Sequence, residues 1–356
     1  MKKKCLLATL FALLSAFLLF GCLGFGPQGE PYLVPDKADG YAVLKPSAIL
    51  SDQDLLKSMN ETSRIDFEKS LNEAKDTYGF DPAAITKIII FMNAEKEAPE
   101  AYTGIIAEGT FDKQKLIGKI REDASVTEEQ YDGTTVYKIV PNSQNELDPG
   151  QDVRINPPIS TSYLAFVTDR QVVYGIEESV KDCIDVKNGK RKALSDGTLD
   201  RMSKAVDSDG VVLVVMKIPA LWTNAIAQSG SGPYDTTSFS KATHLAFSYG
   251  KTGPTMSLKS SVLFRGANDA QKSSDVLQGL LSMARGLSKS GSASEKLLKD
   301  IKVNANGEML SASLEVTKET LDKIEAEMKE QANTQTAQTY STGPDYGTGG
   351  TGGVKD

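Results

Sequence analysis

The sequence predicts an α+β protein built from two related modules, each an antiparallel sheet covered by helices. Strand-like segments are joined by hairpin signals and followed by helical segments along the 356-residue chain, a pattern typical of α+β layers. The series of segments also occurs twice: "DGYAVLKPSAIL" begins at Asp39, and the similar "DGVVLVVMKIPAL" begins at Asp209. We therefore predict an internal duplication, with residues 38–195 as the first module and 196–331 as the second. The alternative is chance similarity between ordinary α+β segments.

In the first module, hydrophobic periodicity and turn residues define the elements. They are, in order, the strand beginning at Asp39, a helix over 54–78, strands over 84–93 and 101–109, a helix capped by Asp112, a hairpin turning at Asp169-Arg170, and a helix over 177–188 with Gly189 as its stop signal.

The second module repeats this order with a shorter early helix. Its elements are the strand beginning at Asp209, a helix over 220–228, strands over 242–250 and 255–266, a helix beginning near Asn268, a hairpin turning at Asn306-Gly307, and a helix capped by Thr317. Asn-Gly is a strong hairpin signal, and threonine is a good N-cap residue. We expect the modules to be joined near 196–209.

The N-terminus has the layout of a secretory signal peptide. Three lysines at positions 2–4 precede the uncharged apolar run 5–20, and the run ends in Leu19, Phe20, Gly21 and Cys22. This ending resembles the lipobox of prokaryotic lipoproteins, in which a cysteine thiol receives a diacylglycerol before the signal peptide is cut ahead of it. The resemblance implies a signal peptide over 1–21 and lipid on Cys22.

A lipid-anchored protein of this kind would lie on the cell membrane, facing outside the cytoplasm. Two acyl chains suffice for stable attachment. The alternative is an uncleaved anchor helix, which leaves the body on the same side because the lysines stay in the cytoplasm. Residues 22–37, rich in Gly and Pro, are predicted to form a tether, and the Gly/Thr-rich residues 332–356 a disordered tail.

The body resembles secreted or membrane-anchored prokaryotic α+β domains of unknown function. The similar stretches are "DGYAVL", "GTFDKQKLIGKI" and "AFVTDRQVVYGIEESVKD". None of these is a catalytic motif, so the resemblance implies an architecture and no activity.

Composition narrows the classes of partner. The net charge of −7 becomes −10 once the signal peptide and its three lysines are removed, which argues against nucleic acid as a partner.

With Cys22 lipidated, Cys183 is the only remaining cysteine. Its spacing predicts a buried helix position, and a reactive thiol is the alternative. Asn60 lies in the N-x-[ST] acceptor "NET" and is a candidate glycosylation site.

Catalytic and cofactor motifs are missing from the sequence. His244 is the single histidine, and we expect a structural role for it on a strand beside Ala246 and Ser248. No phosphate-binding glycine loop, nucleophile elbow or metal-ligand spacing occurs, so we predict no cofactor and no metal. Trp222 and Tyr234 flank a Gly/Ser loop; buried packing is the expectation for Trp222, and an aromatic ligand cleft is the alternative.

The sequence therefore favours a non-enzymatic binding or envelope-structural role at the membrane. The membrane is the partner through the N-terminal lipid, and a small ligand or a protein partner stays unidentified. Two alternatives remain: a carboxylate-dependent hydrolase without a recognisable motif, and an accessory subunit of a membrane complex.

Overall fold

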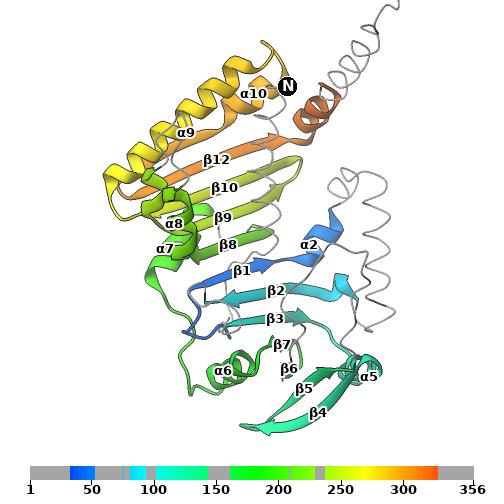
Figure 1. Ribbon diagram of the computed structural model, residues 1–356. Helices are drawn as coiled ribbons and strands as arrows, with labels where there is room; N and C mark the ends of the chain where they lie inside the picture. The colour runs from blue at the N-terminus through cyan, green and yellow to red at the C-terminus, as the bar shows by residue number, and fades with distance from the viewer. Residues whose placement is uncertain are drawn as a thin grey trace, which may run out of the picture.

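The structure is a computed structural model that describes residues 33–52, 75, 81–93, 102–142, 161–207, 210–228 and 237–327. Its strands form one 12-stranded antiparallel sheet in the order β11-β12-β10-β9-β8-β1-β2-β3-β7-β6-β5-β4 (Figure 1). Helices lie against both faces of this sheet, so the α+β class is confirmed. Among the described residues, no helix is both long enough and apolar enough to cross a membrane.

The sheet is organised around the antiparallel pair β1 (Gly40–Leu44) and β8 (Val212–Lys217), in which Ala42 lies opposite Val214. Moving away from β1, the sheet continues with β2 (Ile85–Met92), β3 (Thr103–Gly109), β7 (Gln171–Gly175) and β6 (Ser162–Thr168). Moving away from β8, it continues with β9 (Ala242–Thr252), β10 (Thr255–Phe264), β12 (Met309–Thr317) and β11 (Lys302–Asn306). The two halves thus repeat one strand order, and both contribute to a single continuous sheet.

The first half extends further through a hairpin that sequence analysis did not predict. Strands β4 (Ala124–Tyr131) and β5 (Thr134–Pro141) are joined by Asp132 and Gly133, and both joining residues have positive φ. This conformation defines the tight Asp-Gly turn of a two-residue hairpin.

One face of the sheet is covered by α6 (Glu177–Lys187) and α7 (Gly197–Val206). The helix α6 packs against the first half and α7 against β8, β9 and β10. We call this the α6/α7 face. Its inner residues, together with the facing strands, form the largest hydrophobic core of the described residues.

The opposite face carries α5 (Lys113–Asp123) over the first half and α9 (Ala267–Leu287) over the second. Each of these helices directly follows the third strand of its half, β3 or β10. The remaining helical elements are α2 (Pro46–Ser51), η1 (Pro82–Ala84), α8 (Ala220–Gln228), η2 (Thr237–Lys241), α10 (Ala293–Asp300) and a helix over 318–327.

Most predicted elements are confirmed. Asp112 accepts a hydrogen bond from Lys115 N as the cap of α5, Thr317 accepts one from Thr320 N as a cap, and the first hairpin turns at Asp169-Arg170. The second hairpin is displaced by one residue, since its loop is Gly307-Glu308. The helix predicted over 54–78 lies almost wholly outside the described residues.

Two connecting segments contain buried residues. Residues 196–209, where the modules were expected to join, contain α7, whose Leu199, Met202 and Val206 are buried. The predicted tether ends earlier than residue 37, because Leu33 and Val34 are buried in the core. Although this stretch is rich in Gly and Pro, burial of its apolar Leu33 and Val34 side chains makes these residues part of the fold.

Candidate functional site: a buried ion-pair network

The chain enters the fold through residues 33–39, which we call the strap. Leu194 N donates a hydrogen bond to Val34 O at 2.7 Å, and Asp36 N donates one to Lys192 O at 3.2 Å. Pro35 and Ala193 form an isolated β-bridge between these two bonds. The strap is therefore paired with the segment that follows α6.

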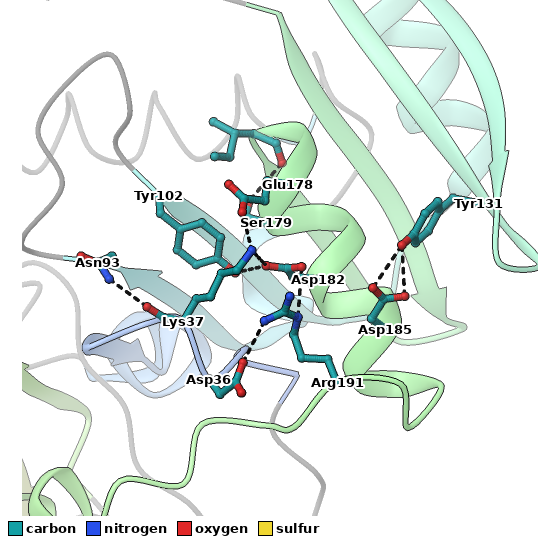
Figure 2. A network of polar contacts seen from close by, with 11 residues as sticks. Asp36, Lys37, Asn93, Tyr102, Tyr131, Glu178, Ser179, Asp182, Asp185 and Arg191 are labelled. Carbon is teal, nitrogen blue, oxygen red and sulfur yellow. Dashed lines mark hydrogen bonds and ion pairs between the residues drawn. The ribbon is translucent and has the colours of Figure 1, made fainter.

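Asp182, on the inner side of α6, is the centre of a polar network beneath the strap (Figure 2). Its side chain is 8% exposed. Tyr102 Oη donates a hydrogen bond to Asp182 Oδ2 at 2.9 Å, and Lys37 Nζ lies 3.2 Å from the same oxygen. Arg191 Nε lies 3.1 Å from Oδ1, within ion-pair distance, although its N–H is not aimed at that oxygen. Two cations thus compensate one buried carboxylate.

Further contacts tie this centre to the strap. Lys37 forms a second ion pair with Glu178, one turn before Asp182 on α6. Arg191 Nη1 donates to Asp36 Oδ1 at 2.9 Å, and Asn93 Nδ2 donates to the backbone oxygen of Lys37 at 3.0 Å. We call the set Asp36, Lys37, Tyr102, Glu178, Asp182 and Arg191 the clamp.

Electrostatics keep the donors of the clamp protonated. The hydrogen bond to Glu178 and the nearby Asp182 raise the pKa of Lys37, even though burial lowers it. Burial alone would lower the pKa of Arg191, but the hydrogen bond to Asp36 and the charge of Asp182 raise it overall. Burial, followed by the charge of Asp182, raises the pKa of Tyr102 far above its ordinary value.

This geometry gives the clamp a structural role. A general base needs a carboxylate that is free to accept a proton from a reacting group. Asp182 already faces one hydroxyl donor and two cations, which stabilise it in the ionised form and occupy both of its oxygens. The clamp therefore fastens the strap to α6, which is the opposite of the accessible acid pair that a hydrolase would need.

A second polar contact joins the extra hairpin to the far end of α6. Tyr131 Oη donates to Asp185 Oδ2 at 3.1 Å (Figure 2). Asn188 Nδ2 donates to Asp132 O at 3.2 Å. Lys190 pairs with the carboxylate of Asp132 at 2.5 Å. Helix α6 is thus held at both ends by side chains from distant segments.

Two of the residues singled out from the sequence behave as structural groups. Cys183 is fully buried on α6, as predicted, and burial raises the pKa of its thiol, which opposes the reactive-thiol alternative. His244 is half-buried on β9, with Nδ1 3.0 Å from Thr243 Oγ1, and burial lowers the pKa of its imidazole. In the part of the chain that the structure describes, no three potential metal ligands gather at one point.

The other singled-out residues lie mostly outside the described residues: Cys22, Asn60 and Tyr234. Trp222 is described, and the expectation that it is buried is wrong. Its side chain on α8 is 43% exposed, because it projects from a short helix that has no fully buried residue among those described.

Grooves lie on the second half of the described residues. A groove of about 410 Å³ lies between α7 and the β11–β12 hairpin and is lined by Arg201, Asn304, Glu308 and Met309, among others. A groove of about 370 Å³ lies beside α8 and is lined by Ala227, Lys241, Asp269 and Lys272, among others. Neither groove includes a clamp residue.

Sequence reasoning missed the clamp. One local signal was available: Asp182 stands beside Cys183 on the inner side of α6, in a helix whose buried residues are otherwise small or apolar. A charged residue at such a position predicts a buried partner. The identity of the partners was not readable, because Tyr102 lies 80 residues away in the chain.

Comparisons with known proteins add little. No protein-family model matches the sequence, and no curated protein matches it. Among solved structures, crystal form III of TP0453 is similar with a TM-score of 0.42 and 11% identity, covering 84% of this chain and 99% of that one. Crystal form IV of the same protein gives 0.41 and 11%, covering 83% and 96%. These values are too low to carry an argument about function.

Proposed function

We propose that this protein is anchored to the outer side of the cell membrane by lipid on Cys22 and has a binding or envelope-structural role there. The observation that carries the proposal is the clamp, because it fixes the chain directly after the lipobox and its tether. A protein that works while attached by its N-terminus needs this end to be firmly joined to the body.

The chain lengths agree with close attachment. Ten residues separate Cys22 from Leu33, the first residue of the strap. Fully extended, they reach about 35 Å. Because the strap is fixed by backbone pairing and by the clamp, any pull on the lipid acts on the centre of the first half and not on a loose terminal strand. The body would therefore stay close to the bilayer.

A binding role is supported by the groove between α7 and the β11–β12 hairpin. Its volume of about 410 Å³ falls within the range of small-molecule sites. Its lining combines Leu263 and Met309 with polar side chains, among them Arg201. Arg201 and Glu308 make this groove suitable for a ligand that carries both signs of charge.

The anchor is tested by mass spectrometry of the full chain from a prokaryotic host that lipidates secreted proteins. The wild-type chain should begin at Cys22 and carry the mass of a diacylglycerol. The Cys22→Ser variant should lack that mass and be misprocessed or released. Cys5→Ser is the matched control, since Cys5 lies in the signal peptide and should leave lipidation intact. Undiminished lipidation of Cys22→Ser would contradict the proposal.

The binding role is tested by comparing native and denatured masses of protein extracted gently from its own membrane. Extra mass in the native state would identify a retained ligand or partner. Arg201→Ala should then lose a ligand held in the α7 groove, whereas Arg265→Ala, at a cation outside the groove, should retain it. Loss from both variants, or from neither, would place the ligand elsewhere.

A further inference from the structure

Helix α8 carries no charged residue and exposes large apolar side chains. Its sequence is "ALWTNAIAQ", and its first residues include Leu221, 63% exposed, and Trp222, 43% exposed. The other large exposed apolar residues of the described chain, Val140, Tyr174 and Leu287, lie on three different elements. Adjacent exposed apolar side chains on one helix indicate an interaction surface.

The position of α8 indicates which surface it meets. Lys217 N, at the end of β8, donates a hydrogen bond of 2.9 Å to the backbone oxygen of Asp39, the last residue of the strap. Helix α8 begins three residues later, at Ala220. The strap and α8 therefore lie at the same end of the sheet (Figure 1). The tether to the lipid joins the fold at that end.

The surroundings of α8 suit a bilayer surface. Tryptophan favours the membrane–water interface, where its ring meets acyl chains and its N–H meets headgroups. Lys241 of η2 and Lys272 of α9 line the groove beside Ala227, at the other end of α8, together with the single acid Asp269. Lysines next to an apolar helix face can meet the phosphates of lipid headgroups.

We propose that α8 lies in the membrane interface, with Leu221 and Trp222 inserted at the boundary between headgroups and acyl chains. The lipid on Cys22 supplies attachment, and α8 supplies a second contact that fixes the orientation of the body. This inference rests on the lipid anchor proposed above. A protein partner or a second copy of this chain on α8 would be a different result.

Trp222 is the only tryptophan of the chain, so its fluorescence reports on α8 alone. The lipidated full chain is reconstituted in phosphatidylcholine vesicles, with or without bromine on the acyl carbons near the headgroup. Bromine quenches a tryptophan that it touches. We expect a blue-shifted Trp222 emission, and a marked loss of that emission in the brominated vesicles.

Leu287 provides the matched control. Its exposed fraction of 60% is similar to that of Leu221. However, Leu287 is the last residue of the 21-residue α9, which begins at the anchored end and runs away from it. A chain with Trp222→Phe and Leu287→Trp should show no quenching. Leu221→Ser should lower the ratio of inserted to detached α8 about tenfold, because a buried apolar side chain is lost. Leu287→Ser should leave this ratio unchanged.

The outcomes separate the two proposals. Lipid on Cys22 with unquenched Trp222 overturns the insertion of α8 and leaves the anchor standing. A blue shift without quenching means that protein covers Trp222, which also overturns the insertion. If mass spectrometry finds no lipid on Cys22, the anchor fails, and the same vesicles are mixed with the unlipidated chain. Absence of quenching there overturns the contact made by α8 as well.

Discussion

The two halves of the sheet share one strand order but fill the α6/α7 face with different residues. In the first half the strands are bulky, with Ile89, Phe91 and Ile106 pointing toward α6. The inner side of α6 combines the smaller Ser179, Val180 and Cys183 with one large residue, Ile184.

In the second half the distribution of volume differs. The strands combine the small Ala246, Ser248 and Ser261 with the large Leu213 and Val215, and α7 adds Leu199 and Met202. Since protein interiors pack to a nearly constant density, small strand residues require large helix residues and the reverse. A repeated topology therefore does not require a repeated core.

The buried polar groups differ in the same way. The first half contains charged groups in the clamp, where Asp182 meets Lys37 and Arg191. The second half contains hydroxyl pairs, such as Ser238 Oγ and Ser273 Oγ at 2.8 Å. The clamp lies where the chain enters the fold, and another partly buried ion pair, Lys251 with Asp52, lies toward the opposite end of the sheet.

The different distributions of volume predict the largest difference between two matched truncations. Met202 of α7 and Cys183 of α6 are both fully buried on the same face. Met202→Ala should lower the free energy of unfolding by about 3 kcal/mol, because it removes most of the volume that α7 contributes and leaves a cavity. Cys183→Ala should cost only about 1 kcal/mol, because it removes one atom opposite bulky strand residues.

Chemical denaturation of both variants measures this difference. The slope of unfolding free energy against denaturant should be unchanged, so that the midpoints compare stability alone. Equal costs for the two truncations would show that the volume is shared evenly, and the comparison of the halves would fail.

The clamp gives the next largest effect. Asp182→Asn should lower the free energy of unfolding by about 2 kcal/mol, since Lys37 and Arg191 lose their buried partner and keep only the more exposed Glu178 and Asp36. The cost stays below that of a fully buried pair because the side chain of Lys37 is 38% exposed. Asp185→Asn, on the same helix, is the control and should cost less than about 1 kcal/mol, because an amide oxygen still accepts from Tyr131.

Local exchange measurements sharpen this result. Hydrogen exchange in Asp182→Asn should increase most at the amides of Asp36 and Leu194, which pair the strap with the segment after α6. A uniform increase across the second half would mean that Asp182 stabilises the whole fold and that the clamp does not act locally on the strap.

Sequence reasoning succeeded where the signal was local. Alternation predicted β2 and β9 within a residue or two, and Asp112 predicted the start of α5 through a capping bond three residues away. It missed the β4–β5 hairpin although Asp132-Gly133 is a strong turn pair. That hairpin has no counterpart among the described residues of the second half, so the repeated pattern gave no sign of it.

The contacts that define the clamp depend on the tertiary fold. Lys37 and Glu178 are 141 residues apart, and nothing in "LVPDKADG" distinguishes a tether lysine from a buried partner. The prediction that Trp222 is buried was wrong for a related reason. An aromatic residue on a short apolar helix is normally buried, and only the packing of α8 shows that Trp222 is exposed. Long-range pairing and exposure are the features that one sequence hides.

The smallest expected effect is a pH dependence that belongs to the first half. Burial raises the pKa of the Cys183 thiol, and the neighbouring Asp182 adds to the shift. The folded state therefore holds this proton more tightly than the unfolded state, in which a thiol titrates near pH 8.5. Stability from Cys183 is complete below that pH and falls as the pH rises above it, by about 1.4 kcal/mol for each pH unit.

Met202, its counterpart on α7, has no proton to lose. Unfolding free energies at pH 7.5 and pH 9.5 should thus converge between wild type and Cys183→Ala as the pH rises, while Met202→Ala keeps a constant offset from wild type. If the Cys183→Ala difference also stays constant, the thiol is not held neutral by the core of the first half.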